Sequence, residues 1–133
     1  MYESIQKKRE KYINKYKEVI FDVLKNNHIQ SIVLTFQGGG DDGQFYIDSV
    51  NADDTVKDKA DLFLEEPIPQ YEIENIKFPT VENAIMDLCY EILFFKDIDY
   101  ANGDGNNGDI VFDVKERKIA VTYEIKESRT DYL

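Results

Sequence analysis

The sequence is poor in the residues that most catalytic and metal sites require. Its 133 residues include one cysteine, Cys89, one histidine, His28, and no tryptophan. A disulfide framework, or a zinc site built on several cysteines or histidines, is therefore excluded within one chain. A Ser-His-Asp triad has only His28 to draw on. We expect Cys89 to be a core residue on an apolar helical face, and His28 to cap the end of a helix.

Long hydrophobic runs are also missing. No window approaches 18 consecutive apolar residues, and the N-terminal stretch MYESIQKKREKY lacks the apolar region of a signal peptide. We therefore expect a cytoplasmic protein that makes no membrane contact.

Positive charge is scarce outside the N-terminal region. The chain has 16 Lys and Arg against 27 Asp and Glu, a net charge of −11. Residues 1–28 hold seven basic and four acidic residues, a net charge of +3, so the other 105 residues carry −14. Such acidity disfavours direct binding to nucleic acid or anionic lipid and favours a basic protein partner. An equally simple interpretation is that the charge keeps the chain soluble and monomeric.

Hydrophobic periodicity predicts an α+β fold. Apolar residues recur at helical spacing over 3–26 and 81–96, and Thr80 has the character of an N-cap. Two-residue alternation predicts strands at 31–37, 44–50, 109–114 and 118–125. We expect two helices packed on a four-stranded antiparallel sheet, in the order helix, hairpin, irregular acidic segment, helix, hairpin. Residues 1–126 would form a single domain, with 127–133 as a polar C-terminal tail.

Two loops rich in glycine and aspartate raise the alternative of a divalent-metal site. One is Gly38-Gly39-Gly40-Asp41-Asp42-Gly43-Gln44 and the other runs from Asp97 to Asp109. The first has no lysine or helix start after its glycines, as a phosphate loop would, and the second fits no EF-hand register. If the loops converged, a Ca²⁺ or Mg²⁺ ion of a metal-binding domain or metal-dependent hydrolase would have four carboxylate ligands, namely Asp41, Asp42, Asp104 and Asp109. Neither loop itself contains a Lys, Arg or His to bind a phosphate.

Two stretches resemble a family of small acidic bacterial proteins of unknown function that occur on plasmids and other mobile elements. They are Ile32–Ile47, IVLTFQGGGDDGQFYI, and Gly108–Glu124, GDIVFDVKERKIAVTYE. The glycine-aspartate-glycine-glutamine core of the first is the more specific part. The resemblance implies a cytosolic protein of the mobile-element type, among which inhibitors and accessory factors are common, and it implies no catalytic residue.

The leading hypothesis from the sequence is a non-enzymatic protein-binding module. It would use an acidic surface against a basic protein partner, for example as a nucleic-acid mimic that inhibits a DNA- or RNA-binding protein. The carboxylates expected to contact the partner are Asp41, Asp42, Asp53, Asp54, Asp58, Asp61, Glu65 and Glu66. This function needs no cofactor, in contrast to the metal alternative. A structural accessory subunit is a third interpretation.

Overall fold

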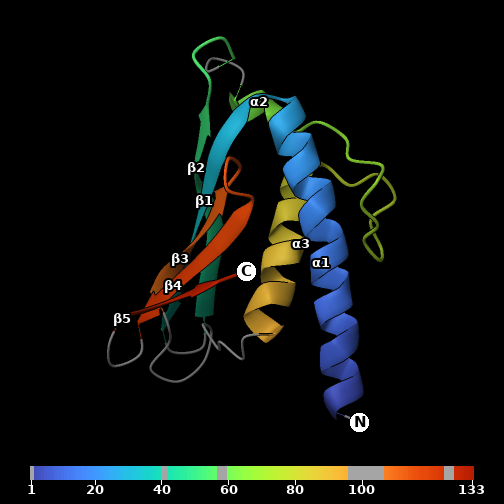
Figure 1. Ribbon diagram of the computed structural model, residues 1–133, viewed down its shortest axis with the longest axis vertical. Coiled ribbons are helices and arrows are strands. Elements are labelled where there is room, and N and C mark those ends of the chain that lie inside the picture. The colour runs from blue at the N-terminus through green and yellow to red at the C-terminus, as the bar shows by residue number, and fades with distance from the viewer. Residues whose placement is uncertain (1, 40–41, 57–59, 96–106, 125–127) are drawn as a thin grey trace.

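The chain folds into two long helices on one side of an antiparallel sheet (Figure 1). The computed structural model describes residues 2–39, 42–56, 60–95, 107–124 and 128–133, with side chains left undescribed at 2–4, 38–39, 42–44, 60–61, 124 and 128–131. The helices are α1 (Tyr2–Asn26), α2 (Ala60–Phe63) and α3 (Val81–Phe95). The strands are β1 (Ile29–Gly39), β2 (Asp42–Ala52), β3 (Asn107–Asp113), β4 (Lys118–Glu124) and β5 (Ser128–Tyr132).

The two long helices and the four predicted strands are all present, so the α+β fold class is confirmed. The sheet, however, has five strands in the order β2-β1-β3-β4-β5. The fifth lies within residues 127–133, which the sequence suggested would be a polar tail. Main-chain hydrogen bonds between Ile119 and Leu133, at 3.1 and 2.7 Å, extend this pairing to the last residue. The second departure is α2, a four-residue helix inside the segment expected to be irregular.

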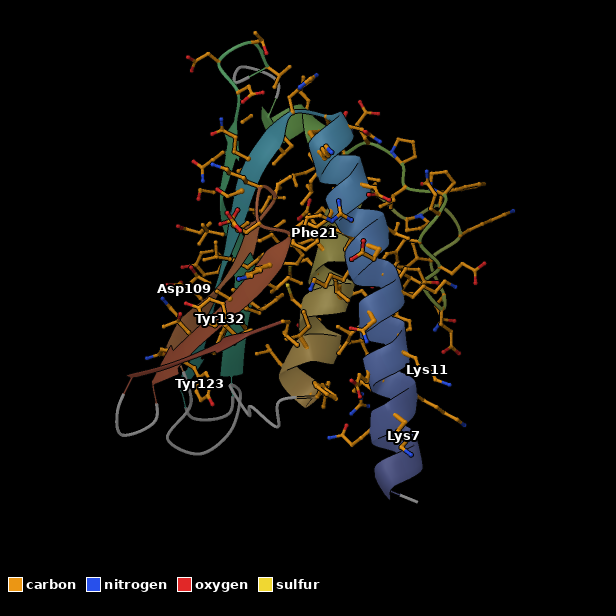
Figure 2. The ribbon with its side chains drawn as sticks, in the orientation of Figure 1. Lys7, Lys11, Phe21, Asp109, Tyr123 and Tyr132 are labelled. Atoms are coloured by element: carbon orange, nitrogen blue, oxygen red, sulfur yellow. The ribbon has the colours of Figure 1, made fainter. Side chains whose placement is uncertain are left out.

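Only one face of the sheet is buried. Alternate residues of the central strands point toward the helices, and they form the core with the apolar stripes of α1 and α3. Phe21 of α1 packs against Phe112 of β3 with ring centroids 5.9 Å apart, and Figure 2 shows Phe21 between the helix and the sheet. The fully buried sheet residues are Ile32, Leu34, Phe36, Ile110, Phe112, Ile119 and Val121. Among the described residues no charged side chain is buried, so the acidic groups lie at the surface.

Local signals in the sequence set where the helices begin and end. Thr80 caps α3 as predicted: its Oγ1 accepts from the Asn83 amide at 3.2 Å, and its own amide donates to Asn83 Oδ1 at 3.0 Å. His28 ends α1 in the left-handed conformation, with φ of 61°. Among the described residues, no helix is long and apolar enough to cross a membrane.

The helix α1 is longer than its partner α3. With 25 residues against 15, it extends roughly 15 Å further at the usual rise per residue. Its N-terminal turns therefore project past α3 (Figure 1). Ile5, which the helical pattern places on the apolar stripe, is consequently 52% exposed.

Two β-bulges interrupt the pairing of the first hairpin. The register shifts between Ile29 and Ser31, and again between Val33 and Leu34. Val33 faces Ser49 and Leu34 faces Ile47, so Asp48 is the extra residue of β2. Asp48 is exposed, and β2 is an edge strand of the sheet.

Gly108 lies where the sheet is most tightly packed. A Cβ atom at this position would come within 2.0 Å of the Thr122 carbonyl oxygen and 2.7 Å of Phe36 Cζ. Both contacts are too short, and the first involves backbone that is held in the β3–β4 pairing. The residue must therefore be glycine for steric reasons.

We predict that Gly108→Ala lowers the free energy of unfolding by about 1–3 kcal/mol, because the added methyl group forces the paired backbone or Phe36 to move. Urea titration followed by circular dichroism measures this loss. The control is Lys118→Ala on the exposed surface of β4, which should change stability by less than about 0.5 kcal/mol. Equal stability of the Gly108→Ala variant and the unsubstituted chain would contradict the tight packing at this position.

Candidate functional site

The eight predicted partner-contacting carboxylates include residues from both ends of β2. Asp42 begins β2 and Asp53 follows its end, so the two are roughly 35 Å apart on an extended strand. Figure 1 shows β2 running the height of the sheet between them. Asp41 and Asp58 lie outside the described residues, and of Asp42 and Asp61 only the backbone is described. Of the eight, four have described side chains: Asp53, Asp54, Glu65 and Glu66. All four follow Ala52 in the chain, after the end of β2 that is opposite Asp42.

The described members of the predicted metal set, Asp42 and Asp109, belong to the opposite end of the sheet. The C-terminal end of β1 pairs with the start of β3, Phe36 lying opposite Gly108, so the two glycine loops leave the sheet from neighbouring strands. Asp109 is exposed on the outer surface and accepts a hydrogen bond from Thr35 Oγ1 at 2.9 Å. Asp104 lies outside the described residues. The described side chains contain no group of three acidic, histidine or cysteine residues that would hold a metal ion, and the metal site stays a prediction.

Asp53 links the end of β2 to the end of α1. Its Oδ1 accepts from Gln30 Nε2 at 2.7 Å, and its Oδ2 lies 3.7 Å from His28 Nδ1. The amide of Asp53 also donates to the His28 carbonyl oxygen at 3.0 Å. Asp53 therefore has a structural role at this corner, whereas the neighbouring Asp54 points into solvent.

Glu65 and Glu66 lie between α2 and the start of α3. The carbonyl oxygen of Glu66 accepts from the Val81 amide at 2.9 Å, which fixes the backbone while both side chains stay exposed. No ion pair involving Asp54, Glu65 or Glu66 occurs among the described side chains. We call the segment 53–66 the acidic segment; among the described side chains, Asp53 is paired with His28, whereas Asp54, Glu65 and Glu66 have no cation partner.

The residues between the acidic segment and α3 form a closed loop, residues 67–79, which we call the proline loop. Pro67 and Thr80 form an isolated bridge, and the Ile68 amide donates to the Pro79 carbonyl oxygen at 3.0 Å. Nearer the tip, the Ile76 amide donates to the Ile73 carbonyl oxygen at 3.2 Å. Figure 1 shows this loop standing out beside the helices, away from the sheet.

A cluster of two tyrosines and a carboxylate anchors the proline loop to both long helices. Tyr71, which is 1% exposed, donates to Asp87 Oδ2 of α3 at 2.7 Å, and Tyr12 of α1 donates to the same oxygen at 2.5 Å. The ring of Tyr16 packs against that of Tyr71 with centroids 4.1 Å apart. Burial, followed by the hydrogen bonds of the cluster, raises the pKa of Tyr71 above its ordinary value of 10.0. The pKa of Tyr12 is also raised, by burial and then by its hydrogen bond to Asp87.

The proline loop encloses a pocket of about 420 Å³ that the sequence interpretation missed. Its lining is largely apolar: Pro67, Pro69, Tyr71, Ile73, Ile76, Phe78 and Pro79, with Glu72 and Lys77. Phe78 is 78% exposed, far more than an aromatic side chain usually is. The sequence shows two prolines and a Phe-Pro pair within an acidic stretch. This pattern alone does not predict a pocket.

The single cysteine is where the sequence placed it. Cys89 is fully buried on the inner face of α3, and burial raises the pKa of its thiol. Because the thiolate is the nucleophilic form, this environment disfavours nucleophilic chemistry at Cys89.

A family model described as a family of unknown function (DUF6878) matches residues 12–132. The chain belongs to this family. The match spans the sheet, α3, the acidic segment and the proline loop, and it includes both stretches on which the resemblance was based. No curated protein and no solved structure matches the chain.

We predict that the protein loses stability as the pH rises above 10.0, the ordinary tyrosine pKa. The unfolded chain ionises there, whereas Tyr71 in the folded chain keeps its proton because its pKa is raised. The contribution of Tyr71 is complete below pH 10.0 and decreases by up to about 1.4 kcal/mol per pH unit above it.

Urea titrations at about pH 9 and about pH 11 test this contribution. Between these two pH values, the Tyr71→Phe variant should lose less free energy of unfolding than the unsubstituted chain. Tyr132→Phe, at a tyrosine that is 66% exposed, is the control and should keep the full loss. If Tyr71→Phe and Tyr132→Phe behave alike, Tyr71 does not contribute to the alkaline destabilisation.

Proposed function

We propose that this protein is a non-enzymatic protein-binding module whose acidic segment docks onto a basic surface of another protein. The observation that carries the proposal is the exposure of Asp54, Glu65 and Glu66 without a cation partner among the described side chains. Because no described cation neutralises these carboxylates, their electric field extends into the surrounding water. A partner with clustered lysines or arginines would gain Coulomb energy there and would be drawn to it during diffusion.

Two lysines, Lys57 and Lys59, belong to the acidic segment, which still holds six acidic residues and a net charge of −4. Lys25, at the end of α1, lines the same pocket as Asp53. Lys7 and Lys11 project from the N-terminal half of α1 (Figure 2), about 28 and 22 Å along the helix from its C-terminal end. That C-terminal end is the one beside Asp53, as the contact with His28 shows. Both separations exceed the screening length of about 8 Å at physiological salt, so Lys7 and Lys11 do not neutralise the acidic segment.

One concrete form of the proposal is a nucleic-acid mimic that blocks a DNA- or RNA-binding protein. A row of exposed carboxylates resembles a phosphate backbone in charge, and a groove evolved for phosphates would accept it. The resemblance to bacterial proteins of plasmids and mobile elements supports an inhibitory role of this kind in the cytoplasm. The proposal requires no cofactor and no contact with nucleic acid or membrane.

We predict that replacing Asp54, Glu65 and Glu66 together with lysine slows association with the partner by at least about tenfold, because the steering field is lost. The partner is first captured from the native host with the unsubstituted chain. Association and dissociation rates are then measured on an immobilised surface. Raising the salt concentration from about 50 to about 500 mM should lower the association rate of the unsubstituted chain by a similar factor.

The control carries the same change in charge at a different place. Glu10, Asp48 and Glu116 are also exposed, and replacing them with lysine should alter the association rate by less than about twofold. Thermal unfolding of both variants should stay close to that of the unsubstituted chain, since none of the six side chains is buried. Equal slowing by the two variants would show that only net charge matters, and indifference to both would refute the acidic segment as the binding surface.

A further inference from the structure

We infer that the pocket of the proline loop is the specificity site of this interaction, receiving one apolar side chain from a basic segment of the partner. The inference rests on the proposed function, and it adds a second kind of contact to charge attraction. The occupant is a stretch of the partner's chain with one leucine-like or aromatic residue flanked by lysines or arginines.

The apolar nature of the pocket defines the central residue of that segment. Buried Tyr71 and Pro79 line it together with exposed Pro67 and Pro69. Phe78 and Ile76 also line it, 78% and 39% exposed. Apolar surface of this kind is removed from water when another apolar side chain packs onto it. Aromatic residues at the centre of such a patch are the usual sites of strong protein contacts.

The charges around the pocket define the flanking residues. Between residues 62 and 80 there are four exposed glutamates and one lysine, so this stretch carries a net charge of −3. Glu72 lines the pocket itself, Glu74 lies at the loop tip, and Glu65 and Glu66 belong to the adjoining acidic segment. A peptide with basic residues on both sides of its apolar anchor would meet complementary charge throughout.

The ring of Phe78 already has an affinity for a cation. Lys77 Nζ lies 5.5 Å from the centre of that ring, which is within the range of a cation–π contact. A lysine or arginine of the partner can make the same contact on the remaining exposed surface of the ring. This contact favours a basic segment over an acidic or uncharged one.

The pocket is held in shape before anything binds. The bridge between Pro67 and Thr80 closes the base of the loop, and the hydrogen bond from Tyr71 to Asp87 fixes the pocket wall to α3. Two prolines restrict the backbone further. Because the loop is already ordered, binding costs little conformational entropy, and even a short peptide can be selected.

The experiment uses the full chain labelled with ¹⁵N and a synthetic probe peptide. The peptide has one central leucine with three lysines or arginines on each side, and a matched peptide has serine in place of the leucine. We expect saturable chemical-shift changes at Ile73, Ile76 and Phe78 with the leucine peptide. Affinity should fall at least about tenfold with the serine peptide, because the apolar contact is lost.

Two variants of the protein test the same contact from the other side. Phe78→Ser should lower the affinity for the leucine peptide by at least about tenfold and the affinity for the serine peptide by less than about fivefold, because only the cation–π contact is lost there. The control is Phe94→Ser, at an aromatic residue of α3 that is 64% exposed and does not line the pocket; it should change affinity by less than about twofold. Both side chains are largely exposed, so both variants should fold.

Each alternative result has a distinct meaning. If both peptides bind equally and the Asp54, Glu65 and Glu66 reversal abolishes binding, the acidic segment is confirmed and the pocket proposal is overturned. If neither peptide binds at millimolar concentration, the pocket proposal is overturned, and the rates with the captured partner decide the acidic segment separately. If the same shifts appear on raising protein concentration without peptide, the occupant is a second copy of this chain, which also overturns the proposal.

Discussion

The structure depends on the burial of one face of the sheet against two helices. Every second residue of β1, β3 and β4 lies in that interface, and the intervening residues face outward. The core it forms is apolar throughout the described residues, so all charged groups are left at the surface. The close approach of β3 and β4 at Gly108 is part of the same constraint, because Phe36 fills the space that a larger residue would need.

The surface that results is divided between two ends of the molecule. The strands β1 and β2 are each 11 residues long, so the loop before β2 and the acidic segment after it are separated by the height of the sheet. At one end the glycine loops leave adjacent strands; at the other lie the acidic segment, the corner at Asp53 and, next along the chain, the proline loop. The two functional hypotheses from the sequence, a metal site and an acidic binding surface, share Asp41 and Asp42. Asp109 at one end and Asp54 at the other belong to one hypothesis each, so substitutions there test the two independently.

The sequence predicted those parts of the fold that depend on hydrophobic periodicity. The helices near 3–26 and 81–96 and the four main strands could be derived from residue spacing alone, as could the cap at Thr80. It did not reveal β5, because Ser128–Tyr132 has no apolar alternation and pairs with β4 through its main chain. The acidic carboxylates were identified as exposed, but their separation depends on the length of β2. The pocket was missed because it is created by long-range contacts, above all those of Tyr71 with Tyr12 and Asp87.

The bulge in β2 has a consequence for how copies of the protein behave beside one another. An edge strand of 11 residues offers a row of main-chain donors and acceptors to any other strand, and such edges promote polymerisation through continuous sheets. Asp48 breaks the regular repeat of that row and adds a charge that an incoming strand would have to desolvate. The bulge and its charge therefore work against continuous pairing along this edge, while β2 stays paired with β1 on both sides of Asp48.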